Sequence, residues 1–247
     1  MAGHSHSANI AVRKGKQDSQ RAKLFSKLAR YIMIASRNGG GDPTTNLRLR
    51  YAIDKARGVS MPKEKIERAV LKGTGELEGE QLEETTYEGY GPGGVAIMVE
   101  ALTDNRARTG GDVRTIFEKY GGNMGTPGTV GYLFDRKGLI TIDAKKYTSE
   151  DAVMTAALEA EAEDFKKEND VYEITCDPTK FSTVLDAIVH AGYDTIEAEV
   201  KNIPKILAEL DLETGKRVLK LVDMMDANED VQNVYTTANF TEEMLAE

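Results

Sequence analysis

The chain has a single cysteine, Cys176, in 247 residues. One cysteine excludes an internal disulfide and any metal cluster that needs several thiolates. Long apolar runs are also missing, since none approaches the roughly 20 residues that a membrane-spanning helix needs. The first residues contain neither the apolar core of a signal peptide nor an Arg-rich transit segment. We therefore expect a cytoplasmic protein with no membrane partner.

Catalytic and metal-binding signals are scarce as well. His4 and His6 form a pair with no third ligand nearby in the sequence, and His190 is expected at the surface, at a helix end. No serine or cysteine stands in a recognisable nucleophile setting, and Cys176, in an apparent strand, is more typical of a core residue. The sequence predicts no catalytic residue, no metal site and no cofactor, and so a protein that is not an enzyme.

Charge, by contrast, is abundant and unevenly placed. Residues 1–75 contain sixteen Lys and Arg but five Asp and Glu, whereas the remaining residues contain sixteen basic and 36 acidic side chains. A basic head on an acidic body favours nucleic acid or another anionic partner over a merely solvated helical face. We predict that the head contacts phosphates through Arg13, Lys14, Lys16, Arg21, Lys23, Lys27, Arg30, Arg48, Arg50 and Arg57.

Hydrophobic periodicity divides the head into three short helices. They are expected from Ser19 to about Arg37, from Thr45 to Arg57, and from Pro62 to about Gly73. Basic residues lie outside the apolar stripes, so we expect them to face water, and residues 73–84 read as a linker. The second and third helices, joined at Gly58, are a weak helix-turn-helix candidate.

In the body, alternating apolar residues predict strands that take turns with single helices. Strands are expected at about 95–101, 130–134, 139–142, 172–176, 196–200 and 231–235, with a turn at 135–138. Each helix shows the i, i+3, i+4, i+7 stripe that is typical of one buried face. The pattern predicts an α+β protein with two ferredoxin-like units after the helical bundle. It leaves open whether these units lie end to end or one inside the other.

Two glycine-rich segments resemble ligand-binding loops. Residues 89–94 spell G-x-G-x-x-G, but a dinucleotide fingerprint follows a strand and opens a helix, whereas these glycines precede a strand. They predict a tight loop into an edge strand. Residues 121–128 either expose N–H groups and approach another backbone closely, or form only a wide turn. The residues leave both interpretations open.

Several strings, in order along almost the whole chain, resemble the YebC/PmpR family of bacterial proteins. They are Met1–Ser5, Ala8–Ile10 with Arg13-Lys14, Asn46–Arg50 with Ala52-Ile53, Met61–Lys63, Ile66–Ala69, Tyr87–Gly94, Glu100–Arg106, Phe134–Gly138 and Asp230–Tyr235. Two departures are local: His6-Ser7 stands where the family usually has Lys-Trp, and Glu161 where glycine is common. The missing tryptophan puts an aromatic stacking role of the first residues in doubt.

The resemblance implies three domains and a role in gene expression. Its domains would be a basic helical domain (1–76), a middle α/β domain (77–134 plus 202–242) and an inserted ferredoxin-like domain (135–201). Family members are described as probable transcriptional regulators that bind DNA, while mitochondrial relatives resemble translational activators that act at the ribosome. The resemblance therefore implies a non-enzymatic, DNA-binding regulator.

Two alternatives stay open. The protein could be a ribosome-associated translation factor that binds rRNA or tRNA, with the acidic body pointing away from the nucleic acid or binding a protein partner. It could also be a protein–protein scaffold, and then neutralising Lys23, Lys27 and Arg30 leaves nucleic-acid binding unchanged.

Overall fold

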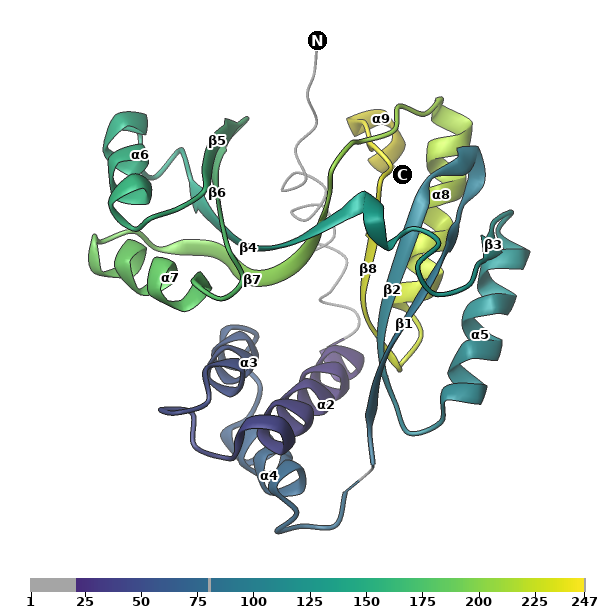
Figure 1. The fold of residues 1–247 in the computed structure, drawn as a ribbon, viewed down its shortest axis with the longest axis horizontal. Helices are drawn as coiled ribbons and strands as arrows, with labels where there is room; N and C mark the ends of the chain where they lie inside the picture. Colours follow the sequence, from purple (N-terminus) through teal and green to yellow (C-terminus); the bar gives the residue numbers. More distant parts are fainter. Residues whose placement is uncertain (1–20, 80, 247) are drawn as a thin grey trace.

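The computed structural model describes residues 21–79 and 81–246, which form a mixed α+β fold as predicted. A helical bundle lies at the bottom of Figure 1, with one four-stranded sheet at the right and another at the left. The helices are α2 (Arg21–Gly39), α3 (Leu47–Gly58), α4 (Lys63–Thr74), α5 (Arg106–Lys119), α6 (Glu150–Glu159), α7 (Phe181–His190), α8 (Leu212–Asp226) and α9 (Glu242–Leu245). The strands are β1 (Glu83–Tyr90), β2 (Ala96–Thr103), β3 (Asn123–Met124), β4 (Phe134–Asp143), β5 (Asp164–Glu168), β6 (Val171–Cys176), β7 (Thr195–Pro204) and β8 (Val231–Thr236).

The bundle of α2, α3 and α4 confirms the three helices expected in the head. Apolar residues of α2 such as Ile32 pack against Leu49 of α3 and Ile66 of α4, and all three are buried. Asn46 caps α3 by accepting a hydrogen bond from the Leu49 N–H at 3.1 Å, and its amide also donates to the Ala35 carbonyl at 2.8 Å. The cap therefore satisfies a free N–H of α3 and ties that helix to α2.

The right-hand sheet has the strand order β3-β1-β2-β8, and α5 and α8 cover one of its faces. Strand β2 pairs with both β1 and β8, so the prediction that it lies at an edge is wrong. The sequence pattern also missed β1, because only Thr85 and Gly89 of that strand are buried and the alternation is weak. The position of β2 in the sheet depends on its two partner strands, and the local sequence pattern of one strand does not reveal its partners.

The left-hand sheet has the order β5-β6-β4-β7, and α6 and α7 pack on one face. The expected turn at 135–138 is wrong, since residues 134–143 form one continuous strand that pairs with β7 along its length. Gly138 is needed there for packing, because a Cβ at this position would lie 2.6 Å from Cδ2 of Phe181 and 2.7 Å from Sγ of Cys176. Glycine in a strand can mark such a close approach as well as a turn.

The chain leaves the right-hand sheet through β4 and returns to it through β7 and β8. Strand β8 pairs with β2, although β4 to β7 lie between these two strands in the sequence. The left-hand unit is therefore inserted in the chain of the right-hand one. This topology agrees with the division that the family resemblance implies, whose domain boundaries stay a prediction. Glu100 links the two units, because its carboxylate accepts hydrogen bonds from Asn202 at 2.9 Å, Asn233 at 3.0 Å and Tyr235 at 3.1 Å.

One turn in the inserted unit explains a departure from the family pattern. Glu161 follows α6 with a φ of 60°, in the left-handed region. Glycine adopts that region without steric cost, whereas a residue with a side chain is strained there. The family's usual glycine is therefore the residue that this backbone conformation favours.

Candidate nucleic-acid interface

The basic face of α2 lies against the acidic body. The Lys27 ammonium donates to the Asp226 carbonyl at 2.7 Å, and Arg30 donates to the Glu229 carbonyl at 3.1 Å and pairs with the Asp230 carboxylate. Asp226 ends α8, where unpaired carbonyls attract cations. The expectation that Lys27 and Arg30 face water is therefore wrong, because the end of α8 lies over them.

Asp230 is the centre of this junction. Its side chain is 6% exposed and accepts hydrogen bonds from Arg108 at 2.8 Å and from the Thr109 hydroxyl at 2.6 Å, besides its pair with Arg30. Burial by itself would raise the pKa of this carboxyl, but the bonds from Arg108, Thr109 and Arg30 lower it below its usual value. One buried carboxylate thus joins α2, α5 and the loop before β8.

Helix α3 is held in the same way by the inserted unit. Arg50 lies 3.3 Å from the Asp186 carboxylate on α7, and the Lys55 ammonium lies 2.6 Å from Glu199 on β7. Between them, the Tyr51 ring packs on Phe181 with 5.2 Å between ring centroids. These contacts fix α3 on the body, so the acidic body does not stand clear of the basic head.

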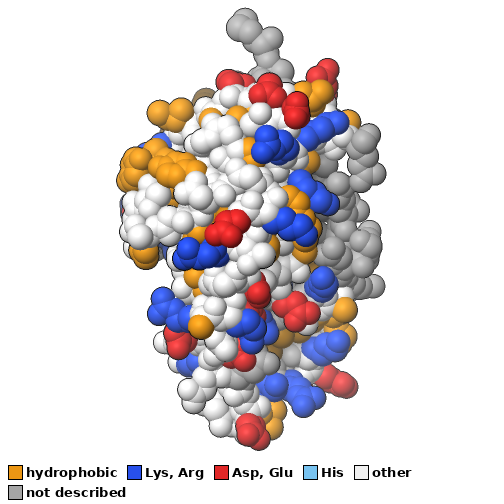
Figure 2. All heavy atoms as spheres, turned by 90° about the vertical axis from the view of Figure 1, so that its right-hand side faces the viewer, with side chains coloured by type: hydrophobic (Ala, Val, Ile, Leu, Met, Phe, Trp, Pro, Cys, Tyr) orange, Lys and Arg blue, Asp and Glu red, His pale blue; other side chains and the backbone are white. Residues whose placement is uncertain are grey.

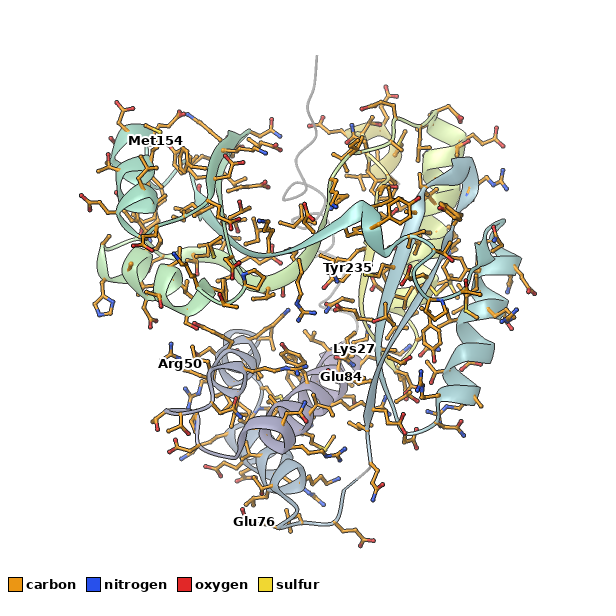
Figure 3. The ribbon with its side chains drawn as sticks, viewed as in Figure 1. Lys27, Arg50, Glu76, Glu84, Met154 and Tyr235 are labelled. Atoms are coloured by element: carbon orange, nitrogen blue, oxygen red, sulfur yellow. The ribbon has the colours of Figure 1, made fainter. Side chains whose placement is uncertain are left out.

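Arg48 completes the junction on the other side. It pairs with Glu84 at the start of β1, and its guanidinium lies 5.2 Å from the centroid of the Tyr31 ring. Figure 3 shows Lys27, Arg50 and Glu84 along the boundary between the bundle and the two sheets, whereas Glu76 lies at the far end of the bundle. The fold thus divides the basic residues of the head into two sets. The docked set, which contacts the body, consists of Lys27, Arg30, Arg48, Arg50 and Lys55.

Of the predicted phosphate contacts, Lys23 and Arg57 stay exposed. Arg57 lies 3.5 Å from Asp54 of its own helix. Arg13, Lys14 and Lys16 lie outside the described residues, as do His4, His6 and the side chain of Arg21. Whether any of these residues contacts nucleic acid stays a prediction.

The fold also reveals cations that sequence reasoning left out. Lys65, Arg68 and Lys72 lie on α4 at positions i, i+3 and i+7, and the first two are exposed. Glu64 and Glu67 lie between these cations in the sequence, so the segment does not stand out as basic. The helical spacing of the three cations was the signal that could have found them.

The glycine-rich loop of residues 121–128 makes the close approach that one interpretation expected. β3 pairs with β1, and a Cβ at Gly122 would lie 2.5 Å from the Tyr90 carbonyl oxygen. The N–H groups of residues 128, 130 and 131 donate to the Glu88 carboxylate at 2.7 to 3.0 Å. Burial would raise the pKa of Glu88, but these three bonds lower it. The anion that these N–H groups bind is therefore the carboxylate of Glu88, from the protein itself.

The remaining polar features offer little for catalysis. Cys176 is buried, and burial together with nearby carboxylates raises the pKa of its thiol to about 11. His190 is exposed at the end of α7, as predicted. Among residues 21–79 and 81–246, no group of three His, Cys, Asp or Glu side chains is placed to hold a metal ion.

A cavity of about 380 Å³ opens beside β4 in the inserted unit, but its described lysines have acidic partners. Lys166 lies 3.1 Å from Asp164, Lys205 lies 3.3 Å from Asp135, and Lys137 pairs with Glu163. Of the aromatic rings of this sheet, Phe165 and Tyr172 stack on each other on the side covered by helices, and Phe134 at the start of β4 is buried. The sheet therefore lacks the exposed aromatic platform with which four-stranded RNA-binding domains stack bases.

The face formed by α5, β3 and α8 is turned toward the viewer in Figure 2. Blue and red side chains are interspersed on it, so it presents no field of one sign. Phosphate binding needs a concentration of positive charge. Within the described residues, the outer side of the bundle, where Lys65 and Arg68 are exposed, is the candidate interface that the basic charge of the head indicates.

Comparison with known proteins covers both parts of the chain. The profile of the TACO1/YebC protein N-terminal domain matches residues 5–76, and that of the TACO1/YebC second and third domain matches residues 82–238. The chain belongs to the TACO1/YebC family. The resemblance noted in the sequence is thus confirmed.

TACO1/YebC relatives match over their full length. A probable transcriptional regulatory protein of Magnetococcus marinus is 51% identical and is covered to 98%, with 99% of this chain aligned. One of Clostridium novyi is 48% identical, with 98% of this chain and 99% of that protein aligned. A crystal structure of a conserved hypothetical protein from Aquifex aeolicus has a TM-score of 0.84 at 45% identity, covering 93% of this chain and 95% of that one. Helices long and apolar enough to cross a membrane are absent from the described part of this TACO1/YebC chain.

Proposed function

We propose that this protein is a non-enzymatic regulator of gene expression that binds nucleic acid and acts in the cytoplasm. The observation that carries the proposal is the distribution of charge: a head of sixteen basic and five acidic residues keeps exposed cations after the acidic body has docked on it. Cations of this kind bind phosphates with little sequence preference. The names of the relatives, probable transcriptional regulatory proteins, support a regulatory role.

The proposal that it is not an enzyme rests on the chemistry of the described side chains. Cys176 is a buried thiol with a raised pKa, which makes a poor nucleophile. His190 donates from Nδ1 to the Asp186 carbonyl at 2.6 Å and lies 14 positions along the chain from Cys176. No described constellation joins a nucleophile to a base in the manner that covalent catalysis needs.

A ribosome-associated role is the second candidate, and the placement of α3 favours it. In a helix-turn-helix the first helix lies across the DNA backbone while the second enters the major groove. Here α3 would be the first helix, yet its Arg50 and Lys55 are bound to the body. With α3 held on the body, the first helix is not free to lie across a DNA backbone, and contacts to phosphates alone suit a structured RNA as well as DNA.

The test is binding of the full-length protein to a mixed-sequence DNA duplex by fluorescence anisotropy, alongside co-sedimentation with ribosomes, both over a salt series. Each phosphate neutralised on duplex DNA contributes about −0.9 to the slope of log K against log salt. Sequence-selective DNA binding with free protein in the ribosome gradient supports transcription. Binding to ribosomes that displaces the DNA duplex from the protein supports a role in translation. Binding to neither, at low salt, contradicts the proposal and leaves a protein–protein scaffold.

A further inference from the structure

The outer helix of the bundle carries a row of cations that the body leaves open. Lys65, Arg68 and Lys72 project from one side of α4, beside the face that buries Ile66, Ala69 and Gly73. At 1.5 Å of rise per residue, the row extends over about 10 Å. In Figure 1, α4 lies at the lower edge of the bundle, away from the two sheets.

These cations differ from the docked set in their partners. Within the described residues, Lys65, Arg68 and Lys72 form no ion pair, and the Lys65 ammonium lies 5.4 Å from the centroid of the Phe25 ring. By contrast, Arg30 and Lys55 each lie against a carboxylate of the body. A cation already paired with a carboxylate must break that pair before it binds phosphate, whereas the α4 row binds without that cost.

The row is held rigidly. A Cβ at Gly73 would overlap the Met33 carbonyl oxygen, so α4 packs on α2 with its backbone in direct contact. At the end of the helix, Gly75 takes a left-handed conformation with a φ of 83° and its N–H donates to the Leu71 carbonyl. Cations on a rigid helix bind with less loss of conformational freedom than cations on a loop.

The shape of the row selects its partner. A single phosphate ion calls for donors that converge on one point, whereas three cations in line match successive phosphates of a polymer. On the neighbouring face of α4, Glu67 lies 3.5 Å from Lys63, while exposed Glu64 repels an anion. This repulsion favours a nucleic-acid strand on the side of the row next to α2. Exposed Lys23 of α2 adds a cation to the same bundle.

From these observations we propose that the α4 row of Lys65, Arg68 and Lys72 is the phosphate-backbone contact surface, in place of the docked cations of α2 and α3. This inference rests on the proposed function and names the surface that performs it. The phosphate chemistry is common to DNA and RNA, so the experiment includes a 30-base-pair mixed-sequence duplex and a structured RNA hairpin of similar charge.

The experiment compares two triple variants of the full chain that remove the same charge. One is Lys65→Gln/Arg68→Gln/Lys72→Gln, and the other, from the docked set, is Arg48→Gln/Arg50→Gln/Lys55→Gln. Binding is measured by anisotropy from low to moderate salt, after circular dichroism has shown that each variant keeps the helical content of the wild type. We expect the α4 triple to bind at least tenfold more weakly at about 0.1 M salt. Its slope on the duplex should fall in magnitude by about 2.7, three times the value for one phosphate.

The docked triple should keep the wild-type slope. If the α4 triple keeps the wild-type affinity and slope while the wild type binds, the inference is wrong and the proposed function stands. If only the docked triple loses slope, nucleic acid displaces the body and the inference is likewise wrong. If the wild type binds neither probe, the proposed function itself fails. Should the α4 triple unfold, the single variants Arg68→Gln and Lys65→Gln, both at exposed positions, carry the test with about 0.9 of slope each.

Discussion

Replacing Asp230 with asparagine should loosen the helical domain from the body. The carboxylate is 6% exposed and meets Arg30, whose side chain is 16% exposed, as well as Arg108, whose side chain is 46% exposed. Breaking one partner of a buried ion pair costs about 3–5 kcal/mol. Because asparagine keeps an acceptor for Thr109 and the exposed Arg108 regains water, we expect Asp230→Asn to lower the free energy of unfolding by about 2–3 kcal/mol.

The pH dependence of this effect has a defined sign. The pKa of Asp230 is lower in the folded protein than in the unfolded chain, so its stabilisation is complete above the ordinary Asp pKa of about 3.9 and is lost as pH falls through the lower folded value. Asparagine does not titrate. The difference in stability between wild type and Asp230→Asn should therefore be constant near pH 6 and shrink below about pH 4.

Urea denaturation followed by circular dichroism suits this measurement, since the chain has no tryptophan. The matched control is Asp170→Asn, which removes an exposed partner of Lys145 and should leave the unfolding midpoint unchanged within error. A loss below about 0.5 kcal/mol for Asp230→Asn at pH 6, or a loss equal to that of the control, would refute the argument that this junction is a buried ion-pair centre.

Three further changes test other parts of the structure. Glu88→Gln should lower the free energy of unfolding by about 1–3 kcal/mol, since a neutral amide is a weaker acceptor for the N–H groups of residues 128, 130 and 131. Because the pKa of Glu88 is lowered in the folded protein, this loss should fade as pH drops below about 4. A loss that stays constant in denaturation curves from pH 7 to 3 would contradict the prediction. Gly138→Ala should cost about 1–3 kcal/mol because the new methyl group meets the Phe181 ring, and a thermal melt that matches the wild type would show that the site has room. The Cys176 thiol should resist a disulfide reagent at pH 8 in the native protein, because it is buried and its pKa is about 11, and should react fully in urea; a fast native reaction would show that the strand opens.

Features of the fold that depend on neighbouring residues could be predicted from the sequence, whereas features that depend on distant residues could not. The helices of the head and most strands of the body were predicted, because neighbouring residues carry the apolar period of a helix or a half-buried strand. The strand expected at 130–134 is wrong, since residues 131–133 form a 3-10 turn and β4 begins at Phe134. β1 was missed because its burial pattern is irregular, and β5 because none of its residues is buried and its only apolar residue is Phe165. Gly138 was taken for part of a turn, since its role depends on the Phe181 ring packed over it.

The sequence by itself determined the α+β class, the three helices of the head, the isolated cysteine and the division into a basic head and an acidic body. Only the tertiary structure decided which cations are available to a partner. Arg30 and Asp230 are separated by 200 positions and Lys55 and Glu199 by 144, and no local pattern links them. Ion pairs of that span depend on how the body folds back onto the bundle. The same fold leaves Lys65, Arg68 and Lys72 outside, because α4 packs on α2 from the side that the body does not cover.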